Sequence, residues 1–481
     1  MSRMNRRKFV KQSLAMAGAS FVVSHAGHRV LGANEIIHVG IGGCGGRGGS
    51  HLGAYLGAKE TDVIYCVDVD QKRAESAAAK AGKKQGKTPL AVQDIRKALD
   101  DKNLNAISCA TCNHWHTLMT IWTVQAGKDI YVEKPATHNV FEGRICTDII
   151  AKSDQIVQTG TQRRSEGRWA QMIEVTKSGK LGKLLISHGL ASKTRRSIGV
   201  KEFSDPPPDL DWNLWVGPAP MQRHHGNLAH YNWHWFWDFG NGEIGNQGVH
   251  QTDCARWAIP GATHPMFVFS LGGRIEYKDQ GQTPNTQLTV YDYGDTILLF
   301  EVCGLVGGKG DDKGIRRVSN DFVYEAGTVV DGSKFTPNDS HKDAQMPKVD
   351  VKLGPGGGPF GNFIEAMRSR KKEDLNAPFE EGHYSASICH LGNISYRLGR
   401  ETKWSEVKKT PFDNDYANER WERICEHLVK NRGLNLGDWP CRIGLPLKFD
   451  PKTEKFIDAP AEANAMLTRP PRKPFDVPET A

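Results

Sequence analysis

The sequence has no long hydrophobic run. No stretch of its 481 residues approaches the roughly 18 consecutive apolar residues that a membrane-spanning helix needs, so we expect no stable membrane span. It also shows no internal repeat. A chain of this length is too long for one small hydrophobic core, and we therefore expect two domains with extensions.

The ten cysteines form no recognisable disulfide framework. Cys109 and Cys112 have the spacing of a redox pair, but they fall where a predicted strand ends and a loop begins, and we interpret them as small buried residues. No group of cysteines and histidines has the spacing of a zinc site, so we expect no metal.

A net charge of +8 at first suggests binding to nucleic acid. Six of the basic residues lie in residues 1–33, which contain no Asp or Glu, so the rest of the chain carries a net charge of about +2. A basic patch is therefore not indicated, and we expect no nucleic-acid partner.

Residues 1–33 have the three parts of an export signal. Arg6 and Arg7 lie in a basic start, a moderately apolar run covers residues 13–24, and small residues follow at 24–26 and Ala33. Adjacent arginines followed by Phe and Lys resemble a twin-arginine signal, and a basic disordered tail is the alternative. We expect export to the periplasm by the twin-arginine machinery. Cleavage is favoured over retention of the segment as an anchor.

The remaining sequence predicts two α/β domains and a C-terminal extension. Residues 34–160 alternate strand and helix patterns, which predicts a Rossmann-type, doubly wound parallel sheet. Residues 161–405 contain longer strand candidates and predict an α+β domain with a large, mostly antiparallel sheet. Residues 406–481 form the extension, whose proline-rich end predicts a tail that wraps the surface or pairs with a neighbour. The broad sheet and the tail indicate a homo-oligomer. The strand candidates are residues 35–41, 61–67, 106–110, 129–132, 156–159, 183–191, 266–271, 286–293 and 296–305.

A glycine-rich loop follows the first strand. Two registers fit the pattern G-x-G-x-x-G, and we prefer the later one because it lets the strand finish through Ile41. Glycines allow the chain to turn tightly and the backbone to approach a pyrophosphate, while the next helix offers free N–H groups. The loop residues predicted to bind a dinucleotide are Gly43, Gly45, Gly46, Arg47 and Gly48.

Asp68 ends the second predicted strand, 25 residues after Gly43. A carboxylate at about this distance accepts hydrogen bonds from the adenosine ribose and repels a 2′-phosphate, which favours NAD over NADP. Lys72 and Arg73 lie close by and leave NADP open.

Five motifs together resemble the glucose–fructose oxidoreductase/inositol dehydrogenase/MocA (Gfo/Idh/MocA) family. They occur in the family's order within roughly residues 35–405, at residues 43–48, 111–116, 133–135, 158–164 and 245–250. The resemblance implies an NAD(P)-dependent oxidoreductase that acts on the CH–OH groups of a sugar, polyol or glycoside. It adds Thr111, Asn113, His116, Glu133 and Lys134 to the predicted cofactor site and Gln162 to the predicted substrate site.

The resemblance also implies the catalytic residues. The family's Glu-Lys-Pro lysine, which lies beside nicotinamide and substrate, maps onto Lys134; a lysine at the carboxyl end of a Rossmann strand can stabilise a developing alkoxide. The family's histidine maps onto His250, which can take the hydroxyl proton and contact the substrate. Asn246 stands where dehydrogenase members usually carry Asp. Because an amide cannot take a proton, Lys134 and His250 are left to share the proton work.

Residues 231–238 are unusually aromatic and can stack on a sugar ring. His234 and Asp238 are substrate-binding candidates there, and a core segment or oligomer interface is the alternative.

Three functions follow. The leading one is hydride transfer between a tightly bound NAD and a carbohydrate alcohol, because an exported enzyme needs a cofactor that does not dissociate. An NAD-dependent glycosidase that acts by transient oxidation and elimination, and a non-catalytic sugar sensor or assembly protein, are the alternatives that Asn246 raises.

Overall fold

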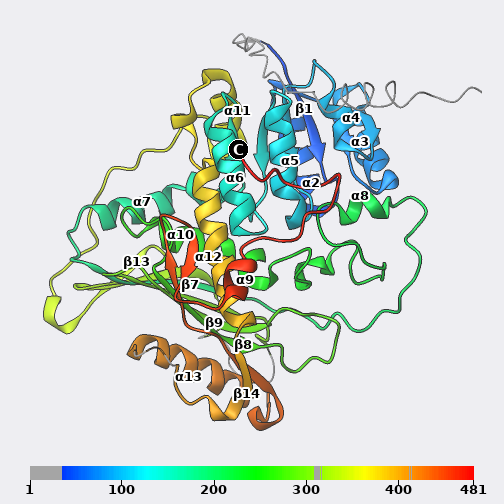
Figure 1. The fold of residues 1–481 in the computed structure, drawn as a ribbon. Coiled ribbons are helices and arrows are strands. Elements are labelled where there is room, and N and C mark those ends of the chain that lie inside the picture. The colour runs from blue at the N-terminus through cyan, green and yellow to red at the C-terminus, as the bar shows by residue number, and fades with distance from the viewer. Residues whose placement is uncertain (1–34, 308–314, 316, 411, 413) are drawn as a thin grey trace, which may run out of the picture.

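The computed structural model describes residues 35–481 apart from 308–314, 316, 411 and 413 (Figure 1). The predicted export signal, residues 1–33, lies outside these residues. Among the helices that are described, none combines the length and the apolar character needed to cross a membrane.

Six parallel strands form the first sheet, in the spatial order β3-β2-β1-β4-β5-β6. The order reverses between β1 and β4, and in such sheets ligands bind outside the carboxyl ends of the strands at this point. The predicted Rossmann sheet is confirmed. Its strands are β1 (Ile37–Gly42), β2 (Thr61–Val67), β3 (Leu90–Val92), β4 (Ala106–Cys109), β5 (Asp129–Val132) and β6 (Val157–Thr159).

Helices cover both faces of this sheet because its central strands are apolar on both sides. On one face, α2 and α3 pack together with α11, a helix that comes from far along the chain (Figure 1). On the other face, α4, α5 and α6 contribute the buried residues. The helices are α2 (Gly46–Gly57), α3 (Gln71–Gln85), α4 (Ile95–Leu99), α5 (Asn113–Gln125), α6 (Val140–Ala151) and α11 (Gly358–Ser369).

The second sheet has 11 strands, and all its pairs are antiparallel except β7 with β10. The predicted large, mostly antiparallel sheet is therefore confirmed. Strands from residues 400–457 extend its edge beside β8. The strands are β7 (Leu184–Ser192), β8 (Phe267–Gly273), β9 (Thr286–Asp292), β10 (Ile297–Cys303), β11 (Val318–Tyr324), β12 (Gly327–Val330), β13 (Lys334–Pro337), β14 (Arg400–Lys403), β15 (Pro440–Ile443), β16 (Leu447–Asp450) and β17 (Lys455–Ile457).

The second sheet lies between two helical layers (Figure 1). Helices α10 (Gly248–Trp257) and α12 (Phe379–Arg397) pack on the face toward the first sheet. Helix α13 (Asp415–Lys430) covers the other face, where Trp421 and Ile424 are fully buried. The remaining α-helices of the described chain are α7 (Gly167–Lys177), α8 (Trp212–Val216), α9 (Gly242–Asn246) and α14 (Ala461–Ala465).

The C-terminal tail, residues 468–481, returns from the second sheet to the helices of the first (Figure 1). Glu454 fixes the turn between β16 and β17, since one of its oxygens contacts Arg144 Nη2 at 2.6 Å and His264 Nε2 at 2.7 Å. Further on, Phe475 packs against the rings of Trp115 and Trp122 on α5. The tail therefore links the two halves of the molecule.

We expect Phe475→Ala to lower the free energy of unfolding by about 3 kcal/mol, because Phe475 is 1% exposed and its removal leaves a cavity beside α5. Urea unfolding followed by tryptophan fluorescence measures the change. Val429→Ala, on the exposed side of α13, is the control and should change stability by no more than about 0.5 kcal/mol. Equal effects of the two substitutions would show that the tail does not stabilise the fold.

Candidate functional site

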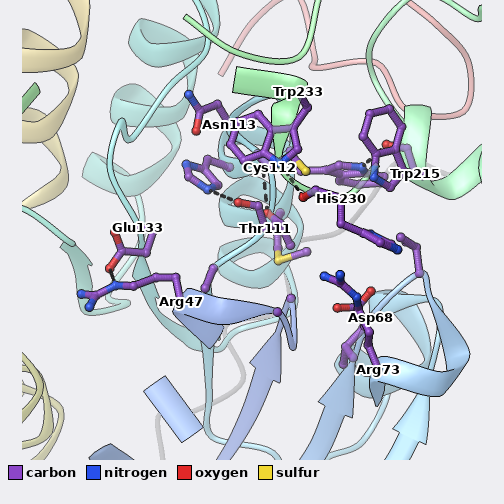
Figure 2. A pocket seen from close by; sticks show the side chains of 18 of the residues that line it. Arg47, Asp68, Arg73, Thr111, Cys112, Asn113, Glu133, Trp215, His230 and Trp233 are labelled. Atoms are coloured by element: carbon purple, nitrogen blue, oxygen red, sulfur yellow. Dashed lines mark hydrogen bonds and ion pairs between the residues drawn. The ribbon is translucent and has the colours of Figure 1, made fainter. Parts of the chain in front are cut away.

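A cavity of about 330 Å³ opens at the carboxyl ends of the parallel strands, between the first sheet and residues 214–246. Figure 2 shows Asp68 and Arg73 toward one end of the labelled side chains, and Arg47 with Glu133 toward the other. Trp215, His230 and Trp233, which belong to residues 214–246, face these side chains. Residues that follow five of the parallel strands, β1 to β5, line the cavity, and residues 214–246 cover it.

Two glycines of the loop, Gly43 and Gly48, are packed so tightly against the backbone that a side chain cannot replace their hydrogens. Gly43 has a φ of +82°, and a Cβ there would lie 2.6 Å from the Ala110 carbonyl oxygen. A Cβ on Gly48 would lie 1.7 Å from the Gly43 oxygen. Helix α2 then begins at Gly46 with no side chain capping its first turn, so its N–H groups are available to an anion.

Asp68 lies directly after β2 and lines the cavity. Its two carboxylate oxygens accept hydrogen bonds from the backbone N–H of Cys44, at 2.7 Å, and of Asp70, at 2.9 Å. Burial raises the pKa of Asp68 from its ordinary value, while these hydrogen bonds oppose the change. Arg73 lines the same end, which keeps a cation next to the ribose-binding position.

The predicted cofactor loop runs from the end of β4 into α5. Thr111, Asn113 and His116 all line the cavity. The His116 ring lies between two carbonyl oxygens, of Pro135 at 2.7 Å and of Thr111 at 3.1 Å, and Asn113 Nδ2 donates to Asn241 Oδ1 at 3.2 Å. These bonds hold the loop against the cavity wall.

Glu133 is buried at the centre of a polar group. Its Oε1 accepts from Arg47 Nε at 2.7 Å and from Gln162 Nε2 at 3.1 Å, and lies 3.1 Å from His51 Nε2. Burial alone would raise the pKa of Glu133, but His51 and Arg47 hold it well below its usual range. Glu133 therefore stays ionised and positions Arg47 and Gln162.

Lys134 is the next residue after Glu133, and its side chain reaches the second half of the molecule. Its Nζ donates to the main-chain oxygen of Asn246 at 2.7 Å. Burial lowers the pKa of Lys134, whereas the charges of Glu133 and Glu243 raise it. Asn246 lines the cavity at the end of α9.

His250 lies in the first turn of α10, four residues after Asn246. Within the described part of the chain, no hydrogen bond to its ring is recorded, and burial holds its pKa well below the ordinary value, assisted by the charge of Lys134. The imidazole is thus neutral at pH 7 and available to a substrate proton.

The aromatic segment contributes one of its two predicted polar residues to the cavity. His234 lines it, stacked on Trp233 with ring centroids 3.6 Å apart. Asp238 is exposed, accepts a hydrogen bond from Gln222 Nε2 at 3.1 Å and does not line the cavity.

Sequence reasoning missed several residues of this site. Trp215 and His230 line the cavity, and Glu243 lies buried beside Asn246. Only Glu243 had a sequence signal, namely an acid three residues before the position where the family's acid is absent. Arg195, which pairs with Glu243, lies 48 residues away and had none.

Two family models match the chain. "Oxidoreductase family, NAD-binding Rossmann fold" of the Gfo/Idh/MocA group matches residues 37–161, and "Oxidoreductase family, C-terminal alpha/beta domain" of the same group matches residues 196–431. Together they cover most of the chain.

Curated relatives match the N-terminal part. Inositol 2-dehydrogenase 2 of Saccharopolyspora erythraea is 29% identical over 157 residues, which are 32% of this chain and 44% of the relative. Myo-inositol 2-dehydrogenase of Thermotoga maritima is 25% identical over 173 residues, 35% of this chain and 47% of the relative. The match thus spans less than half the length of these relatives.

Solved structures share the fold of both halves. The WlbA dehydrogenase of Bordetella pertussis, in complex with NADH and UDP-GlcNAcA, aligns with a TM-score of 0.53 and 16% identity over 74% of this chain and 94% of that chain. An oxidoreductase of Thermotoga maritima aligns with a TM-score of 0.52 and 14% identity over 74% of this chain and 96% of that chain.

We expect Gly48→Ala to destabilise the protein by about 3 kcal/mol and to abolish dinucleotide binding, because the new Cβ collides with the Gly43 carbonyl. Gly49→Ala is the matched control: nothing lies within 4 Å of its Cβ, and alanine should stabilise the helix by up to about 1 kcal/mol. Thermal unfolding and titration with NAD measure both. Retained binding in Gly48→Ala would disprove this role of the loop.

Proposed function

Because the chain belongs to the Gfo/Idh/MocA oxidoreductase family, we propose that it transfers a hydride between NAD and a CH–OH group of a sugar, polyol or glycoside. The observation that carries the proposal is the contact between Lys134, just after strand β5, and Asn246, which ends α9 two residues before the helix that bears His250. Lys134 and Asn246 line the cavity, and His250 lies one helical turn after Asn246, outside the lining residues.

The residues present fit an NAD molecule. Gly43, Gly45 and Gly46 line the cavity with no side chain in the way, Gly48 packs closely against the Gly43 carbonyl, and the uncapped start of α2 suits a pyrophosphate. Asp68 is placed for the adenosine ribose and disfavours a 2′-phosphate, which supports NAD over NADP, although Arg73 lies close by. When bound there, the nicotinamide accepts or supplies the hydride.

Lys134 and His250 have separate roles in the proposed proton transfer. The ammonium of Lys134 can donate to the oxygen of the reacting alcohol or carbonyl and stabilise negative charge on it. His250 is neutral and can accept the hydroxyl proton when an alcohol is oxidised. Asn246 can hold a hydroxyl but cannot take its proton.

The relatives and the residues that line the cavity support a polyhydroxylated substrate. The relatives named above are inositol dehydrogenases, and one structural neighbour was solved with a nucleotide sugar acid. Tyr231 and His234 line the cavity and suit a polyhydroxylated ring. Asp238, which is exposed, supports no substrate contact in this arrangement.

A glycosidase that acts by transient oxidation is the second candidate. His234 and His250 both lie within electrostatic reach of Lys134, and burial lowers the pKa of each. Two neutral imidazoles provide the two bases that oxidation and subsequent elimination require. Release of nitrophenol from nitrophenyl glycosides without added oxidant supports this candidate, whereas stoichiometric NADH formation supports the first.

We further propose that residues 1–33 direct export with the cofactor already bound. In cells that express the full chain, we expect protein recovered from the periplasm to release NAD on denaturation, as identified by chromatography. The double substitution Arg6→Lys and Arg7→Lys should keep the protein in the cytoplasm, because the signal needs the arginine pair. Periplasmic protein that is empty and rejects added NAD would refute the proposal of a tightly held cofactor.

We expect Lys134→Met and His250→Gln each to lower kcat for the best sugar alcohol by about 10²- to 10⁴-fold, because each removes a proton-handling group. NAD affinity, measured by titration, should change little in His250→Gln. His341→Gln, at an exposed position, is the control.

The pH profile provides the accompanying test. Since the pKa of His250 is depressed, oxidation of the alcohol should persist well below pH 6.5 and fall only when the imidazole becomes protonated. A profile that falls already between pH 7 and 6.5 would contradict the assignment of His250 as the base.

A further inference from the structure

Glu243 is a buried carboxylate beside the catalytic centre. It lies on α9, is 2% exposed and precedes Asn246 by three residues. A buried acid needs partners that compensate for its loss of water. Its partners show what it does there.

Arg195 pairs with both oxygens of Glu243: Nη2 donates to Oε1 at 2.7 Å and Nε donates to Oε2 at 2.9 Å. Glu243 Oε2 also faces the amide nitrogen of Asn246 at 3.4 Å. An ionised carboxylate can only accept hydrogen bonds, so it selects the orientation in which the Asn246 nitrogen points toward Glu243. The Asn246 amide oxygen is then left as an acceptor for a substrate hydroxyl.

The same carboxylate acts on Lys134, whose Nζ is bound to the main-chain oxygen of Asn246. The negative charges near this ammonium are those of Glu133 and Glu243, and Glu133 is already shared among Arg47, His51 and Gln162.

The cations that face Lys134 are Arg47 and Arg195, and the imidazoles that face it are His116, His234 and His250.

We propose that Glu243 supplies to the hydride-transfer centre the carboxylate that position 246 lacks, as a positioning residue that orients the Asn246 amide and places a negative charge beside Lys134. This inference rests on the proposed function. It gives Arg195 the opposite effect on Lys134, because Arg195 neutralises Glu243 and adds a positive charge of its own.

The test measures Lys134 itself in the purified full chain. Competitive acetylation across a pH series, quantified by mass spectrometry for the peptide that contains Lys134, gives the pKa of this one amine. Glu243→Gln should lower that pKa by about one pH unit, since a nearby opposite charge is removed. Arg195→Gln should raise it, and the double substitution should return it toward the value of the unchanged protein.

Kinetics provide a second readout. Glu243→Gln should lower kcat at least tenfold. The pH profile of kcat should move to lower pH together with the pKa of Lys134, and the KM for NAD should stay nearly unchanged. Glu243→Asp keeps the charge and should recover part of the loss. Thermal unfolding of each variant identifies those that do not fold.

The inference is overturned if Lys134 titrates alike in all folded variants, or moves in the same direction in Glu243→Gln and Arg195→Gln. Either result would make Glu243 only the structural partner of Arg195. If the unchanged protein binds no NAD and oxidises no sugar while the opposite pKa changes are observed, the proposed function fails and the electrostatic role of Glu243 stands.

Discussion

The hydrogen bond from Lys134 to the main-chain oxygen of Asn246 joins the end of a parallel strand to the end of helix α9 in the other half of the molecule. Neither half contains the site alone. A displacement of about 1 Å between the two would break this bond, since hydrogen bonds weaken steeply beyond their normal length. The contacts between the two halves hold them in the relative position that this hydrogen bond requires.

Several buried contacts cross between the two halves. Arg164, just after β6, pairs with Asp253 on α10 at 2.9 Å and with Glu381 on α12 at 3.0 Å. Helix α11 completes the hydrophobic core of the first sheet, although it follows strands β7 to β13 of the second in sequence. The C-terminal tail adds a further contact, because Phe475 packs against α5. Because the chain crosses between the halves more than once, the two sheets cannot separate without exposing apolar surface.

Sequence periodicity identified both sheets, because central parallel strands are continuous apolar runs and each βα unit has a typical length. The position of Lys134 at the end of a strand is also a local feature, whereas Asn246 and His250 were assigned through the resemblance to the family's motifs. It could not place Arg195 beside Glu243, since that pairing depends on the three-dimensional approach of β7 to α9. Asp238 illustrates the opposite error, in which a residue within a suggestive aromatic segment turns outward.

The electrostatic design of the site follows from burial. A buried lysine tends to lose its proton, and a buried carboxylate tends to gain one, unless opposite charges compensate. Around Lys134 the compensation comes from two carboxylates, each held by an arginine: Glu133 by Arg47 and Glu243 by Arg195. Each arginine weakens the influence of its carboxylate on Lys134 without cancelling it. The ammonium therefore lies among balanced charges, and the proposed role of Glu243 is that of the acid one helical turn before Asn246.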